Sequence, residues 1–163
     1  MANDSNAPSA RTLRAFQDQN VYAALGRAVS YLMLKPSFAA QKFGVWSRNL
    51  VGQINRKHYF LVTDGKKIVG YAGWALVSEE RAKAWAAGGP EAPSEDCLHG
   101  DTMIVNGWAA DDGEVNHFVR QEMRRHLVGL KGVYAKRVYK DGRVRPFKLG
   151  LNDALDAHLR VER

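Results

Sequence analysis

Three aspartates stand at the two ends of one short apolar run, and their type and spacing are the first signs of chemistry in this chain. Asp101 precedes the apolar residues 103–105, and Asp111 and Asp112 follow them. Carboxylates beside a buried strand can serve as general bases, and strand-to-helix junctions often hold functional residues. Aspartate is also a preferred helix cap and turn residue. Spacing alone favours this structural role for the pair at 111–112.

The other reactive side chains form no recognisable catalytic or metal-binding pattern. The five histidines, His117 among them, are scattered singly, and the glycines form neither a dinucleotide nor a phosphate-binding motif. The single cysteine, Cys97, follows Glu95 and Asp96, whose charges disfavour a reactive thiolate. We therefore expect no metal and no cofactor. One cysteine cannot form an internal disulfide, and the N-terminal residues lack a signal-like apolar run, so a cytoplasmic location is expected.

Basic residues gather in the last third of the chain. The formal net charge is +7, and ten Lys and Arg lie between residues 120 and 148. Such a field attracts acidic partners: a carrier protein, a lipid headgroup or nucleic acid. Nucleic acid is disfavoured, because most aromatic residues occupy core-periodic positions. The predicted docking residues are Arg120, Arg124, Arg125, Lys136, Arg137, Lys140, Arg143 and Arg145.

The elements that must position these residues follow from periodicity and turn chemistry. Residues 1–18 are expected to form a flexible tail, and residues 19–163 a single domain. Apolar residues at helical spacing predict helices over about 21–33 and 37–54, separated at Pro36. Two runs joined through Asp64 and Gly65 predict a hairpin. Further elements are expected in this order: a helix at 79–87, a strand at 103–105, a helix from 114, a second hairpin at 133–147 and a helix near 153–159.

This order predicts an α+β domain, with helices packed on a mixed sheet and two N-terminal helices first. No stretch approaches the roughly 18 apolar residues that a membrane span needs. Pro146 is expected on an edge strand or at the end of a strand, because proline cannot donate a ladder hydrogen bond.

Several segments, in this order and spacing, resemble the RTX toxin-activating lysine acyltransferases, the hemolysin-activating family. The resemblance covers about residues 21–150 and rests on Leu25-Gly26-Arg27-Ala28-Val29-Ser30-Tyr31-Leu32, Pro36, Gly70-Tyr71-Ala72-Gly73-Trp74-Ala75, Gly100-Asp101, residues 105–109 and Tyr134-Ala135-Lys136-Arg137-Val138. It implies a GNAT-like, mostly antiparallel sheet. It also implies transfer of a fatty acyl group from acyl carrier protein to a lysine of a partner, possibly an RTX-type protein, by a homodimer.

At the two catalytic positions of the family the chain departs from the pattern. Phe38 stands where the resemblance places the catalytic histidine, and Asn106 stands where it places the aspartate. Phenylalanine has no proton to exchange, and an amide cannot act as a base. Two hypotheses follow. The first is an acyltransferase with a rearranged site, in which Asp101, Asp111, Asp112 or His117 is the base and Asn106 binds the oxyanion. The second is an inactive relative that binds an acidic protein, an acylated carrier or a lipid headgroup.

Overall fold

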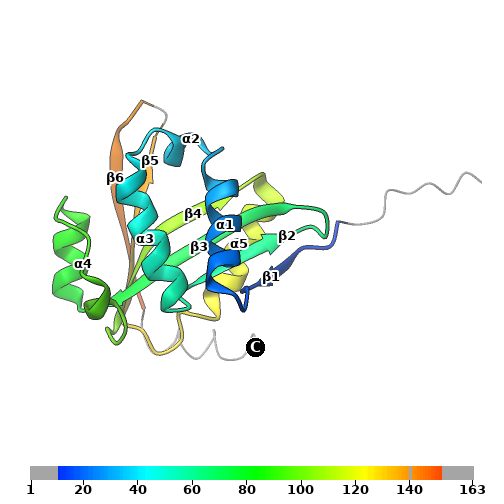
Figure 1. The fold of residues 1–163 in the computed structure, drawn as a ribbon. Helices are drawn as coiled ribbons and strands as arrows, with labels where there is room; N and C mark the ends of the chain where they lie inside the picture. The colour runs from blue at the N-terminus through cyan, green and yellow to red at the C-terminus, as the bar shows by residue number, and fades with distance from the viewer. Residues whose placement is uncertain (1–10, 140, 152–163) are drawn as a thin grey trace, which may run out of the picture.

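Six strands form one sheet in chain order (Figure 1). The computed structural model describes residues 11–139 and 141–151. All neighbouring strands are antiparallel except β4 and β5, which are parallel. The predicted α+β class, with a mixed and mostly antiparallel sheet, is therefore confirmed. The strands are β1 (Arg14–Phe16), β2 (Tyr59–Thr63), β3 (Ile68–Val77), β4 (Thr102–Ala110), β5 (Gly132–Val138) and β6 (Val144–Gly150).

Helices cover both faces of the sheet. Figure 1 shows α1 and α3 on the face toward the viewer and α5 on the other face. The apolar clusters agree, because Leu32 and Leu50 pack with Tyr71 on one side, whereas Val115 and Val119 pack on the other. A third cluster lies under α4. The helices are α1 (Val21–Leu32), α2 (Pro36–Ala39), α3 (Phe43–Asn55), α4 (Glu79–Ala86), a 3-10 turn η1 (Ser94–Cys97) and α5 (Gly113–Arg124).

The N-terminal segment differs from the expectation in two ways. Residues 14–16, assigned above to a flexible tail, form β1 and pair with β2, so the expected tail is wrong for these residues. Gln17 holds the segment by donating hydrogen bonds to the carbonyls of Lys57 and Tyr59. The expected helix at 37–54 is split into α2 and α3, because Pro36 starts a single short turn. The helix predicted near 153–159 lies outside the described residues.

β4 and β5 pair along only part of their lengths. Their parallel register runs from Thr102 to Val105 on β4 and ends at Ala135 on β5, although β4 continues to Ala110 and β5 to Val138. The two strands therefore part beyond Val105. This divergence opens the sheet between helices α3 and α5.

A β-bulge lies where the strands part. The register between β3 and β4 passes from Gly73 opposite Gly107 to Trp74 opposite Val105, which leaves Asn106 as the extra residue. A bulge bends its strand and turns the extra side chain out of the regular alternation. Asn106 is thereby placed at the opening of the sheet.

Within the described residues, no helix is long and apolar enough to cross a bilayer.

Candidate active site

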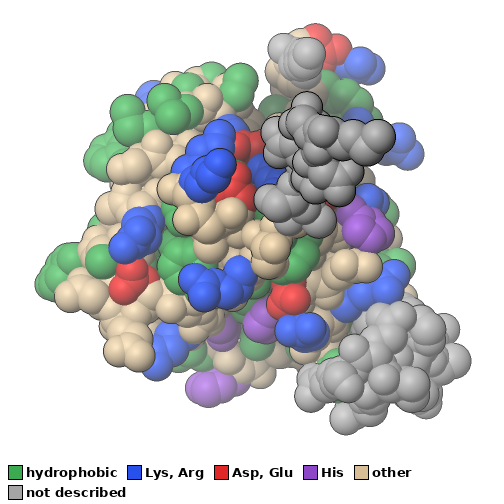
Figure 2. Space-filling view, turned by 90° about the vertical axis from the view of Figure 1, so that its right-hand side faces the viewer, with side chains coloured by type: hydrophobic (Ala, Val, Ile, Leu, Met, Phe, Trp, Pro, Cys, Tyr) green, Lys and Arg blue, Asp and Glu red, His purple; other side chains and the backbone are tan. Residues whose placement is uncertain are grey.

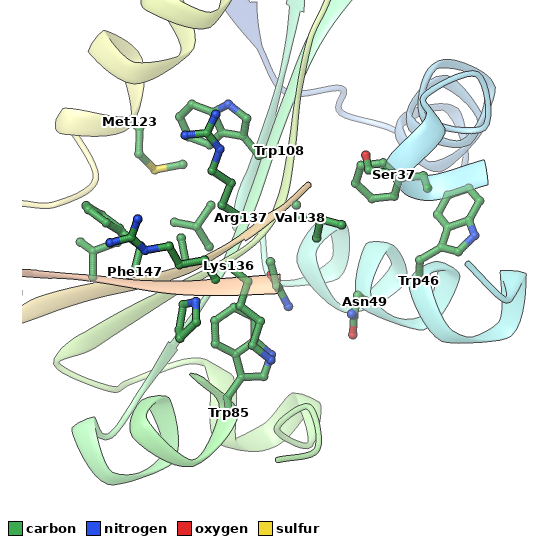
Figure 3. Close-up of a pocket in the computed structure, with 18 of the residues that line it drawn as sticks. Ser37, Trp46, Asn49, Trp85, Trp108, Met123, Lys136, Arg137, Val138 and Phe147 are labelled. Carbon is green, nitrogen blue, oxygen red and sulfur yellow. The ribbon is translucent and has the colours of Figure 1, made fainter. Parts of the chain in front are cut away.

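A pocket of about 1140 Å³ fills the opening between β4 and β5. Figure 3 shows its wall drawn from distant parts of the chain: Ser37 and Trp46 from the N-terminal helices, Trp85 from α4, and Met123 from α5. A depression of about 510 Å³ adjoins it. Both hollows are lined by Asn49, Glu91 and Asn106, among others. The pocket thus passes through the sheet rather than lying on one face.

The structure brings together the two positions at which the resemblance places catalytic residues. Phe38 on α2 and Asn106 on β4 both line the pocket. The Phe38 ring is 8% exposed and meets the Trp46 indole edge-on, with the ring centroids 5.8 Å apart. Position 38 is therefore an apolar wall, whereas position 106 is polar.

A chain of hydrogen bonds runs from the sheet core to the pocket. The Tyr71 hydroxyl donates to Gln53 Oε1 at 2.6 Å, and Gln53 Nε2 donates to Asn106 Oδ1 at 2.6 Å. Asn106 Nδ2 then donates to Glu91 Oε2 at 3.3 Å. Gln53 is fully buried. A Cβ at Gly73 would lie 2.2 Å from Gln53 Oε1, so glycine at this position makes room for the Gln53 amide.

Glu91 is held by a second donor, the indole of Trp85. Trp85 Nε1 donates to Glu91 Oε1 at 2.9 Å. The Lys136 ammonium lies 4.1 Å from the centre of the same indole ring. Burial lowers the pKa of Lys136, and the negative charge of Glu91 opposes that shift. Among the described lining residues Glu91 is the only carboxylate, and none is a histidine.

The aspartates singled out from the sequence lie elsewhere, in ion pairs. Asp101 pairs with Lys131 at 2.7 Å, and that bond lowers the Asp101 pKa. Asp112 caps α5 by accepting from the amide of Val115, which lowers its pKa. None of these residues lines the pocket.

Asp111 lies outside the pocket, where it pairs with residues of α1 and of the turn that follows it. It accepts hydrogen bonds from the Tyr31 hydroxyl and the Lys35 ammonium. Burial raises the pKa of Asp111, but these two bonds outweigh burial and leave the pKa lowered. His117 is exposed on α5. Neither Asp111 nor His117 lines the pocket.

The predicted basic face divides into two groups. Arg120, Lys136, Arg137 and Arg145 line the pocket. Arg125 and Arg143 form short-range ion pairs with Glu122 and Asp141, and Arg124 lies in the last turn of α5. Lys140 lies outside the described residues. On the side of the molecule shown in Figure 2, Lys and Arg are scattered among Asp and Glu.

His58 is a half-buried residue away from the pocket, and its titration can be tested. It stacks on Trp74 at 5.9 Å, its Nδ1 is buried without a partner, and burial lowers its pKa to about 4. Because this folded-state pKa lies below the unfolded value near 6.5, its stabilising contribution is complete above about pH 6.5 and is lost as pH falls toward 4.

His58→Phe should remove this acid sensitivity while keeping the stacked ring. We compare the unfolding free energy of the variant with that of wild type at each pH. This difference should be about 1–2 kcal/mol more in favour of the variant at pH 4.5 than at pH 7. Urea denaturation at both pH values measures the difference. A gain that is the same at both pH values would contradict a titrating His58.

Solved structures define the class of fold. The loading GNATL domain of CurA from Lyngbya majuscula superposes with a TM-score of 0.53 at 13% identity, covering 80% of this chain and 68% of that one. The GphF GNAT-like decarboxylase in complex with isobutyryl-CoA gives a TM-score of 0.45 at 13% identity, with 79% and 67% covered. The superposition on the GNATL domain of CurA shows that the chain has a GNAT-like fold.

The chain belongs to the RTX toxin acyltransferase family, which it matches over residues 17–145. No curated protein sequence matches it. The family resemblance seen in the sequence is thereby confirmed. The matched region ends at Arg145, within β6, and includes both Phe38 and Asn106.

Two residues of the pocket were missed by sequence reasoning. Glu91 lies in a Gly-Gly-Pro-Glu-Ala-Pro loop with no periodic signal, and Gln53 looked like one more polar residue at the end of a helix. The only available signal for Gln53 was its place among the apolar positions of α3 beside Leu50 and Ile54, since a polar residue on a buried helix face needs a partner.

Proposed function

We propose that this protein is an acyltransferase that moves a fatty acyl group from acyl carrier protein to the side-chain amine of a lysine in a partner protein, by a rearranged site. Family membership supports the acyl-transfer chemistry. The observation that carries the proposal is the pocket itself, which lies where the sheet opens and holds polar groups beside an apolar wall. A thioester requires both environments.

The two parts of the pocket suit the two parts of an acylated carrier. Apolar side chains line one part and can bury an acyl chain: Met123, Leu127, Val133, Phe147 and Leu149. Basic side chains line another part and can meet the phosphate of the carrier's prosthetic arm and its acidic surface: Arg120, Arg137, Arg145 and Lys148. Asn106 has a second amide hydrogen besides the one given to Glu91, and it can donate to the developing oxyanion.

A non-catalytic binding function is the second candidate, and one observation favours it. The buried Phe38 ring occupies the position at which the resemblance places a histidine. A protein that keeps the pocket without the histidine can retain an acylated carrier or another acidic partner without turnover. Binding without label transfer would support this candidate.

The remaining expectations stay part of the proposal. A cytoplasmic location is proposed from the single cysteine, and an RTX-type protein substrate from the family resemblance. A homodimer, too, is proposed from the family resemblance. Acyl carrier protein serves as donor and no other cofactor is proposed.

Label transfer tests the proposed function directly. The protein is mixed with acyl carrier protein carrying a radiolabelled fatty acid and with a lysine-containing RTX-repeat protein. We expect a stable label on the acceptor that survives hydroxylamine, because an amide resists this reagent and a thioester does not. Ala135→Trp, which fills the opening between β4 and β5, should lower transfer at least about 10-fold. Ala84→Trp on the exposed side of α4 is the matched control. No transfer at high protein concentration would contradict the proposal.

A further inference from the structure

We propose that Glu91 is the general base of this acyltransferase, so that the base comes from the loop after α4 rather than from α2, where the resemblance places it. This inference rests on the proposed function and names the residue that would carry its chemistry. The carboxylate is placed for this role by three observations: its position in the pocket, its two fixed donors and the direction of the hydrogen-bond chain that ends on it.

Position alone separates Glu91 from the other carboxylates. It lines both the pocket and the adjoining depression, so it lies at their boundary. The three aspartates considered above are paired outside the pocket with Lys131, Lys35 and Arg11. Among the described lining residues, Glu91 is the only side chain that is anionic at neutral pH.

The two donors orient the carboxylate and leave it room to act. Trp85 Nε1 binds Oε1 and Asn106 Nδ2 binds Oε2, one bond to each oxygen. An ionised carboxylate has about four acceptor sites. Two sites therefore stay open to the ammonium of a substrate lysine. Both donors are neutral, so neither holds the proton acceptor in a tight ion pair that would weaken it as a base.

The negative charge of Glu91 sets the donor-to-acceptor direction of the hydrogen bonds that link Tyr71, Gln53 and Asn106 to it. A carboxylate only accepts, so Asn106 must turn its NH₂ group toward Glu91 and its oxygen toward Gln53. Gln53 must then donate to Asn106 and accept from the buried Tyr71 hydroxyl. This donor direction suits a carboxylate at position 91, which accepts at both of its oxygens. The chain therefore holds Glu91 as an acceptor, the form that a base requires.

Asn106 explains how a carboxylate can act at position 91. An aspartate at position 106 would place a second carboxylate about 3.3 Å from the first, the distance that now separates Nδ2 from Oε2. Like charges so close disfavour ionisation of both groups. The amide removes that repulsion and supplies a donor. An amide at position 106 and a carboxylate at position 91 are thus compatible neighbours, whereas two carboxylates would not be.

The step balances as follows. Glu91 takes one proton from the lysine ammonium and passes it to solvent, and the freed amine attacks the thioester carbonyl carbon to form the C–N bond. The oxyanion collapses, the C–S bond breaks, and the second nitrogen proton ends on the leaving thiolate through the Glu91 carboxylate. The products are an amide, the free thiol of the carrier and one proton released to solvent.

Glu91→Gln with two different acceptor amines provides the test. With the lysine acceptor, the variant should lose about 10²-fold or more in transfer rate, since a positioned base contributes about 10²–10⁴-fold. With hydroxylamine as acceptor the loss should be under about 10-fold, because this amine is unprotonated at neutral pH and needs no base. Rates without protein are subtracted. Glu91→Asp should recover part of the lysine activity.

Controls make each outcome decisive. Glu95→Gln changes an exposed carboxylate of η1 outside the pocket and should match wild type. Circular dichroism and the melting temperature show whether Glu91→Gln is folded. If it is not, Glu91→Asp is used instead and its pH–rate profile is measured. A change in the base must shift that profile. Equal losses with lysine and hydroxylamine would overturn the inference, since they mark a positioning role. Full lysine activity of Glu91→Gln would overturn it too. No transfer by wild type would overturn the proposed function, and this inference with it.

Discussion

Asn106→Asp, although it introduces the acidic residue that the resemblance places at this position, is expected to lower acyl transfer at pH 7 by about 10- to 100-fold. The new carboxylate would lie next to Glu91 in place of a donor. Two carboxylates this close titrate as a coupled pair, and one of them is pushed to a higher pKa. A larger share of Glu91 would then be protonated and unable to accept a proton.

The pH dependence separates this cause from a general disturbance of the site. The rising acid limb of the transfer rate should move to higher pH in Asn106→Asp. The unfolding free energy should also depend on this carboxylate pair. One carboxyl has a folded-state pKa raised above the unfolded value near 4, so the variant loses no stability below about pH 4. The loss develops as pH rises through the raised pKa. At pH 7 we expect a loss of about 1–3 kcal/mol in unfolding free energy relative to wild type.

A matched variant and a double variant complete this test. Asn116→Asp adds the same charge to the pocket lining from α5, on the other face of the sheet, and should have a smaller effect. Adding Phe38→His to Asn106→Asp should recover activity if an imidazolium at position 38 can neutralise the second carboxylate. A rise in activity for Asn106→Asp alone would contradict the predicted repulsion and would favour the catalytic pattern of the family.

Gly100→Ala is expected to be the most destabilising single methyl addition, with a loss of about 3 kcal/mol or more in unfolding free energy. A Cβ at this position would lie 2.0 Å from the carbonyl carbon and oxygen of Val77. These atoms belong to the backbone of β3, so no side-chain rotation can relieve the contact. The strands β3 and β4 would have to separate at the point where Val77 pairs with Thr102.

Urea denaturation followed by circular dichroism measures this loss. Gly113→Ala, at the exposed start of α5, is the control, since a Cβ there meets no atom within 4 Å. It should change stability by less than about 1 kcal/mol. A loss under about 1 kcal/mol for Gly100→Ala would show that the β3–β4 connection is more adaptable than the close contact implies.

Local signals account for the parts of the fold that could be predicted. The hairpin at Asp64 and Gly65 was predictable because the glycine supplies a positive φ, which is +89°. The edge position of Pro146 followed from its missing donor and is confirmed, since β6 ends the sheet. By contrast, β1 spans only residues 14–16, and its pairing with β2 joins residues that are 45 to 49 positions apart in the sequence, so no short-range pattern predicts it.

Only some of the residues of the site could be predicted from the sequence. Phe38 and Asn106 were identified by comparison with a family pattern, and the structure shows that they share a pocket. Glu91 enters that pocket from a loop, and its partner Trp85 is a helix residue with an ordinary core periodicity. Which carboxylate reaches a cavity is decided by tertiary packing, since Asp101, Asp111 and Asp112 have equally suitable chemistry and lie outside it.

The short parallel ladder between β4 and β5 makes the two halves of the sheet unequal in local stability. Only four residue pairs join β5 to β4, and every residue of β6 is exposed. The β5–β6 hairpin therefore has less packing than the central strands to resist sub-global opening, and its amide protons should exchange with solvent before those of β2 and β3. Opening of this unit would widen the gap proposed to receive the acyl chain, so the proposed entry route of a bulky thioester coincides with a weakly held edge of the domain.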